Sequence, residues 1–103
     1  MTSSCETIRP LGIFDGAAAP AFHNSVSQAL AQNPALVIID FQETSFIDSS
    51  GLGALVSAQK KVRSQGKKLH FCNLNAQIEM IFELTSLDQA FDIFTTLDEA
   101  QQL

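Results

Sequence analysis

The sequence contains no tryptophan and no tyrosine, so its aromatic residues are eight phenylalanines, spread along the chain as core residues would be. Charged residues are also scarce, at 17% of the 103 residues, whereas hydrophobic residues make up 46%. This composition argues against an intrinsically disordered protein, because it supplies enough apolar side chains for a core. The length fits a single domain over residues 1–103.

Basic residues are few: six Lys and Arg against eleven Asp and Glu give a formal net charge of −5. An acidic domain is repelled by the phosphates of nucleic acids and by anionic membrane surfaces, so we expect neither as a partner. Four lysines do cluster, at Lys60, Lys61, Lys67 and Lys68. We interpret them as a solvated helix end and strand start, with a phosphate-binding patch as the alternative.

The chain has only two cysteines, Cys5 and Cys72, and their spacing matches neither a metal site nor a CxxC motif. We expect two reduced, partly buried thiols in a cytoplasmic protein, although sequence alone leaves a disulfide open. The N-terminus lacks the basic and apolar regions of a signal peptide. No apolar stretch approaches the roughly 18 residues of a transmembrane helix, so no membrane association is expected.

Short apolar runs alternate with helical patterns along the chain. Strands are predicted over residues 7–14, 35–41, 67–72 and 91–94. Helices are predicted to begin at Pro20, at the serine pair after Asp48, at Asn75 and at Thr96. This β-α-β-α-β-α-β-α order predicts an α/β domain with a mixed or largely parallel sheet of about four strands and flanking helices.

Individual residues refine this outline. Pro10 cannot donate to a sheet ladder, so the first strand is expected at an edge or with a bulge. The run over residues 35–41 (ALVIIDF) suits a central strand that is buried on both faces. In the second helix, we assign Gln59 to the exposed side, and Gly66 is expected just past the C-terminal end.

The sharpest local feature is the segment over residues 46–53 (FIDSSGLG), where a short apolar strand end leads directly into a helix. Asp48, Ser49 and Ser50 are three consecutive residues able to cap that helix. The free N–H groups and the helix dipole favour an anion there, so a phosphoserine would be accommodated. It would add about −1.5 to −2 charges while leaving the fold intact. Ordinary helix capping is the alternative interpretation.

The sequence offers little support for an enzymatic function. A nucleophilic serine would need a nearby histidine, but Gly-x-Ser-x-Gly is absent, His23 is predicted on a helix and His70 within a strand. The chain lacks a P-loop and a dinucleotide fingerprint, so no cofactor and no catalytic residue are predicted. A serine hydrolase is kept only as a hypothesis that ester turnover would revive.

Four carboxylates, those of Asp15, Asp40, Glu43 and Asp48, could face one end of the sheet. No spacing among them supports a metal site, so we interpret them as turn and cap residues on an acidic surface and predict no bound metal.

The stretch from Val37 to Phe94 resembles the STAS domain, the fold of bacterial anti-sigma factor antagonists. Residues 46–55 (FIDSSGLGAL) are similar to the phosphorylation motif of that family. Residues 12–15 (GIFD) resemble its early Gly-x-Leu-Asp turn, with Phe14 in place of the usual Leu, and residues 81–87 (IFELTSL) its late helix-to-turn segment. In style the second half looks most like cyanobacterial members.

The resemblance implies a partner-switching cycle and no enzymatic activity. An unphosphorylated member binds an anti-sigma factor, a serine kinase of the histidine-kinase-like ATPase fold, which frees the sigma factor or another target. Phosphorylation abolishes binding, and a PP2C-type phosphatase restores it. In the family the modified residue is the serine directly after Asp, here Ser49, with Ser50 as its neighbour. The implied partner-binding residues are Asp15, Asp48, Ser49, Ser50, Gly51 and Leu52, of which the last two are expected to form a small flat surface.

One departure concerns the N-terminal strand of the family, which is expected to be shortened or absent here, since about six residues precede Thr7. An exposed strand edge can pair with another chain, so we expect a monomer or a weak dimer. The alternative function is a scaffold or ligand-sensing module of the same fold within a larger signalling assembly.

Overall fold

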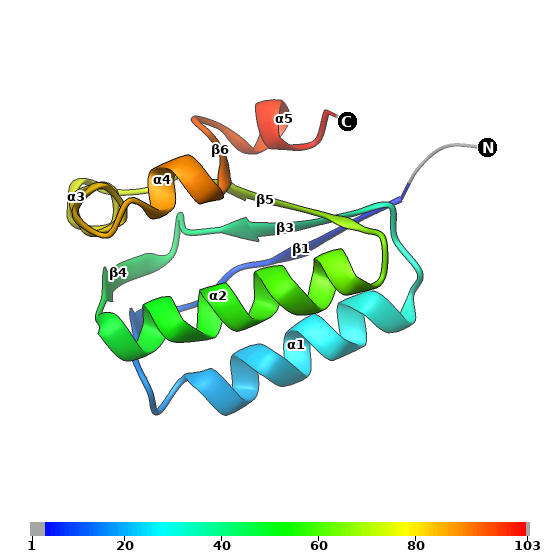
Figure 1. The fold of residues 1–103 in the computed structure, drawn as a ribbon, viewed down its shortest axis with the longest axis horizontal. Helices are drawn as coiled ribbons and strands as arrows, with labels where there is room; N and C mark the ends of the chain where they lie inside the picture. Colours follow the sequence, from blue (N-terminus) through cyan, green and yellow to red (C-terminus); the bar gives the residue numbers. More distant parts are fainter. Residues whose placement is uncertain (1–3, 103) are drawn as a thin grey trace.

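The computed structural model describes residues 4–102 and contains two parallel sheets (Figure 1). The larger sheet has the strand order β1, β3, β5, β6, with bounds Cys5–Ile8, Leu36–Asp40, Lys68–Cys72 and Asp92–Phe94. The smaller sheet pairs β2 (Gly12–Phe14) with β4 (Thr44–Ile47). The predicted α/β class and four-stranded parallel sheet are confirmed.

The described residues form five helices: α1 (Ala19–Ala31), α2 (Ser49–Ser64), α3 (Ala76–Leu84), α4 (Leu87–Ala90) and α5 (Leu97–Ala100). Helices α1 and α2 lie side by side against one face of the large sheet, and α5 lies on the other side (Figure 1). Within residues 4–102, no helix combines the length and the hydropathy needed to cross a bilayer.

The single strand predicted over residues 7–14 is wrong, because the chain divides it into β1 and β2, which belong to different sheets. Pro10 interrupts the ladder because it has no N–H, and Gly12 adopts a φ of +68°, which turns the chain away from β3. Two further elements, β4 and α4, were not predicted as separate elements. In β4 the burial pattern does not alternate, since Ser45 and Phe46 are both exposed.

Strand β3 is buried along its whole length, as the sequence predicted. Val37 and Ile39 face the core under α1 and α2, whereas Leu36 and Ile38 pack with residues from β5 and α5 on the opposite face. This central strand fixes the layer on which the smaller sheet and α2 are built.

The exposed position predicted for Gln59 is wrong. Its side chain is 8% exposed, and Nε2 donates to the carbonyl oxygen of Ala90 at 3.0 Å. A glutamine on the flank of an amphipathic helix usually faces water, and its partner is 31 residues away. Burial is tolerated here because the amide is hydrogen-bonded.

The caps predicted at Asn75 and Thr96 and the glycine predicted after α2 are confirmed, whereas α1 begins at Ala19, one residue before Pro20. Asn75 caps α3 by accepting from Ile78 N at 2.9 Å, and Thr96 caps α5 by accepting from Glu99 N at 3.2 Å. Gly66 follows α2 with a φ of +75°, the left-handed region that favours glycine. Cys5 and Cys72 are both free thiols, half-buried and buried respectively.

Candidate functional site

The two strands of the small sheet end next to each other, and each is followed by an aspartate. Phe14 pairs with Ile47, and the Asp48 N–H donates to the Phe14 carbonyl oxygen at 3.4 Å. Because the strands are parallel, their carboxyl ends share one edge, so Asp15 and Asp48 follow the same edge. The fold thus places at one edge of the small sheet the two aspartates that the family resemblance implied for partner contact.

Of the three residues able to cap α2, Asp48 is the cap. Its Oδ1 accepts from Gly51 N at 2.9 Å, and its backbone is extended, with φ −113° and ψ −175°. Ser49 and Ser50 are therefore the first two helical residues, and both are exposed. The helix start does not need their hydroxyls, which leaves them available for chemistry.

The two serines differ in what lies beside them. A Cβ built on Gly16 would lie 3.4 Å from Ser50 Cβ and 3.6 Å from Ser50 Oγ. Ser50 thus faces the turn between β2 and α1. Both hydroxyls remain exposed, and only Ser50 faces this turn.

The small flat surface expected at Gly51 and Leu52 is a wrong prediction. Gly51 is buried against β2, and Leu52 is 7% exposed and part of the main core. The bare surface belongs to Gly53, which is exposed and where a Cβ would meet nothing within 4 Å. The alternation of helix faces places Gly53 outside, a signal that the short Gly-Leu-Gly string obscures.

Asp15 also stabilises the turn between β2 and α1. Its Oδ1 accepts from the backbone N–H groups of Ala17 at 3.1 Å and Ala18 at 3.2 Å, which closes the turn leading into α1. The carboxylate is half-buried, so one side still faces solvent. Asp15 therefore shapes the surface beside the serines and stays accessible to a partner. We call Asp15, Asp48 and Ser49 the polar rim.

Sequence reasoning missed a glutamine that supports the site. Gln77 in α3 accepts from Ile47 N at 3.0 Å and donates to Ile47 O at 2.8 Å. Asn75 donates to the carbonyl oxygens of Thr44 and Ser45, both at 3.2 Å. These two side chains satisfy the outer edge of β4 as a neighbouring strand would. They hold the residue just before Asp48 in place.

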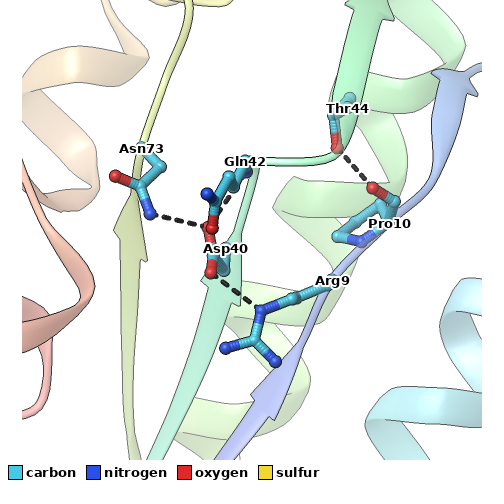
Figure 2. A network of polar contacts seen from close by, with 6 residues as sticks. All are labelled: Arg9, Pro10, Asp40, Gln42, Thr44 and Asn73. Atoms are coloured by element: carbon cyan, nitrogen blue, oxygen red, sulfur yellow. Dashed lines mark hydrogen bonds and ion pairs between the residues drawn. The ribbon is translucent and has the colours of Figure 1, made fainter.

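A second polar network anchors the connection from β3 to β4 (Figure 2). The fully buried Asp40 carboxylate accepts from Arg9 Nε at 3.0 Å, Gln42 N at 2.9 Å and Asn73 Nδ2 at 2.9 Å. Both oxygens accept from these donors, so Asp40 is a buried structural residue, and its assignment to an acidic surface is wrong. In residues 4–102, no group of His, Cys, Asp and Glu has the arrangement of a metal site.

The network also affects Cys72. Burial, and secondarily the negative charge of Asp40, raise the pKa of the Cys72 thiol to about 11. The nearby Arg9 guanidinium only partly offsets this effect. The thiol is therefore kept protonated at neutral pH, which disfavours a nucleophilic role.

The geometry removes His70 as the base of a serine hydrolase. His70 is 5% exposed, and its Nδ1 lies 2.7 Å from the Ala100 carbonyl oxygen. Its neighbours Leu69 and Phe71 in β5 point into the core under α2, so His70 points to the opposite face. It cannot act as a base for a serine at the start of α2.

Fold and site together define a small α/β domain that presents a serine at the start of a helix, between two aspartate-ended strands. The STAS domain family model matches residues 2–100, so the chain belongs to this family.

Individual relatives and solved structures are consistent with this family assignment. The chain is 36% identical over 64 residues to the anti-sigma-B factor antagonist of Bacillus subtilis (strain 168), covering 62% of this chain and 59% of that protein. An anti-sigma factor antagonist from Mycobacterium paratuberculosis has a crystal structure similar at a TM-score of 0.83 and 24% identity, over 97% and 85% of the two chains. The phosphorylated form of the Bacillus cell fate determinant SpoIIAA gives a TM-score of 0.69 at 24% identity, over 97% and 90%. These structures share the fold.

Proposed function

We propose that this protein is an anti-sigma factor antagonist that works by partner switching, with Ser49 as the phosphorylated residue. Unphosphorylated, it binds an anti-sigma factor that is also a serine kinase of the histidine-kinase-like ATPase fold. Phosphorylation of Ser49 releases this partner, and a PP2C-type phosphatase restores binding. The protein acts in the cytoplasm as a binding module without enzymatic activity of its own.

One observation carries the proposal: Ser49 is exposed directly after the capping Asp48, at the start of a helix whose next two residues after the serine pair, Gly51 and Leu52, are buried. A phosphate on the first turn of α2 meets free backbone N–H groups and the positive end of the helix dipole. The helix therefore tolerates the modification.

The effect of the phosphate falls on the partner contact. It adds about two negative charges beside the Asp48 and Asp15 carboxylates. Any partner that covers this rim must then desolvate three anionic groups together, which weakens the complex. The buried contacts of Gly51 and Leu52 remain unchanged, so the switch alters affinity without altering the fold.

The test begins with an affinity pull-down from the native cell, with and without ATP, followed by phosphopeptide mapping. The captured kinase is then purified and titrated calorimetrically with wild type, Ser49→Ala, Ser49→Asp and the matched control Ser50→Ala. We expect Ser49→Ala to bind like wild type and to accept no phosphate. Ser49→Asp should raise the Kd about 30-fold or more.

Ser50→Ala should be phosphorylated and should bind normally. One full equivalent of phosphate on Ser49→Ala would show that Ser49 is the wrong residue. Unchanged affinity of Ser49→Asp and of the phosphorylated protein would exclude the switch itself.

A further inference from the structure

Three exposed apolar side chains lie together beside the candidate site, and we call Leu11, Ile13 and Phe46 the apolar patch. Their exposed fractions are 75%, 60% and 46%. Ile13 and Phe46 are cross-strand partners in the small sheet, so their side chains share its outer face. The patch exposes on the order of 300 Å² of apolar surface, a size that on a monomer is often functional.

The patch is held outward by the residues that alternate with it. Phe14 and Ile47 are at most 1% exposed, and a one-residue shift in register would expose them. Thr44 Oγ1 also donates to the Pro10 carbonyl oxygen at 2.7 Å, which fixes the two strands to each other. The surface is therefore preorganised, and a partner meets little ordering cost on binding it.

A hollow of about 260 Å³ adjoins the patch. It lies between α1 and the connection from β1 to β2, and its walls include Pro10, Leu11, Ala21 and Phe22. Ile13 and Phe46 do not line the hollow, but Leu11 belongs to both, so the patch and the hollow meet at this residue. Such a recess beside an apolar surface suits an aliphatic or aromatic anchor from a protein partner.

The patch is also continuous with the switch. Strand β2 leads from Ile13 to Asp15, and β4 leads from Phe46 to Asp48 and Ser49. At about 3.3 Å per residue, Phe46 and Ser49 are roughly 10 Å apart along the chain. A protein that reaches the Ser49 hydroxyl therefore also meets the patch.

Charge identifies the kind of occupant. The patch is flanked by the carboxylates of Asp15, Glu43 and Asp48. Arg9 lines the hollow, but its guanidinium is paired with the Asp40 carboxylate at 3.0 Å. The cations Lys61 and Arg63 lie in the last turn of α2, about 20 Å from its start. A second copy of this chain would bring the same carboxylates against each other. An apolar anchor flanked by Lys or Arg fits better.

We propose that the apolar patch and its hollow dock the anti-sigma factor kinase that acts on Ser49, through an apolar side chain flanked by basic residues. This inference rests on the proposed function. The patch holds the partner by shape and apolar contact. Phosphorylation of Ser49 changes the charge of the adjoining polar rim. The two parts of the interface are then separable by substitution.

The experiment titrates full-length protein with purified anti-sigma factor kinases of the same organism. The variants are Ile13→Ser combined with Phe46→Ser, Leu11→Ser alone, and the matched control Leu84→Ser, an equally exposed apolar residue on α3. Circular dichroism and thermal unfolding verify that each variant folds. Sedimentation of the wild type and the double variant reports self-association.

We expect the double variant to raise the Kd about tenfold or more and Leu11→Ser to raise it severalfold, while Leu84→Ser binds like wild type. Unchanged binding by folded patch variants, with Ser49→Asp still weakening the complex, would overturn the docking surface and leave the proposed switch standing. The reverse result would retain the surface and reject the switch. A wild-type dimer that the double variant dissociates would make a second copy the occupant, and failure of wild type to bind any such kinase would reject both proposals.

Discussion

Gly51 in the first turn of α2 lies directly against the carbonyl oxygen of Phe14 at the end of β2. A Cβ on Gly51 would overlap this backbone oxygen and would also lie 2.9 Å from Ile47 Cγ1. Neither neighbour is the free end of a flexible side chain, so neither can move aside. This close approach presses the helix start onto the small sheet and sets the position of the preceding serines.

Gly51→Ala is therefore expected to destabilise the protein by about 2 to 3 kcal/mol, because the helix must move away from β2. Urea denaturation measures this loss. The matched control is Gly53→Ala, whose Cβ meets nothing within 4 Å and which should stabilise by about 0.5 to 1 kcal/mol through helix propensity. Equal stabilities for the two variants would contradict the close contact between Gly51 and the Phe14 carbonyl oxygen.

Gln77→Ala should loosen the strand that leads to the switch. The substitution removes both hydrogen bonds to the Ile47 backbone and is expected to cost about 1 to 2 kcal/mol. Hydrogen exchange of the Ile47 amide should accelerate more than exchange in β3. Gln89→Ala, at an exposed position of α4, serves as the control. Unchanged protection at Ile47 would mean that the amide of Gln77 does not support β4.

The Cys72 thiol should be unreactive in the folded protein at pH 8, because its pKa is raised to about 11. A thiol reagent applied to a Cys5→Ser variant reports on Cys72 alone, and modification should require unfolding. The unfolded thiol has a pKa near 9, so between about pH 9 and 11 the folded state holds a proton that the unfolded state has lost. Stability from this group is thus present below pH 9 and falls as the pH rises.

Cys72→Ala removes this contribution. Its stability should depend less steeply on pH between 9 and 11 than that of the wild type, when unfolding free energies are compared across this range. A rapid reaction of Cys72 at pH 8 under native conditions, or identical pH profiles, would contradict the assigned pKa.

Much of the fold follows from local rules. The buried run in β3, the caps at Asn75 and Thr96 and the alternation of strands and helices are encoded in neighbouring residues, so the sequence alone predicts them. The second sheet was missed because β2 and β4 are only three and four residues long and are joined by pairing across about 30 residues. Patterns of hydrophobicity carry no record of such a pairing.

The site shows the same division. The aspartate cap and the exposed serines were visible in the motif, whereas the burial of Gly51 and Leu52 depends on where β2 lies. The roles of Gln59 and Gln77 depend on partners about 30 residues away. Glutamine is usually a surface residue, so the residue type alone does not predict either hydrogen bond.

The uneven placement of charge along α2 has a kinetic consequence. Asp48 begins the helix and Lys61 and Arg63 end it, so the charges along α2 are negative at the serine end and positive at the other. In the field of a cationic protein, such a molecule rotates before the surfaces touch and arrives with the serine end forward. A larger fraction of encounters is then productive, which raises the association rate constant. This increase should diminish as added salt screens the electrostatic field.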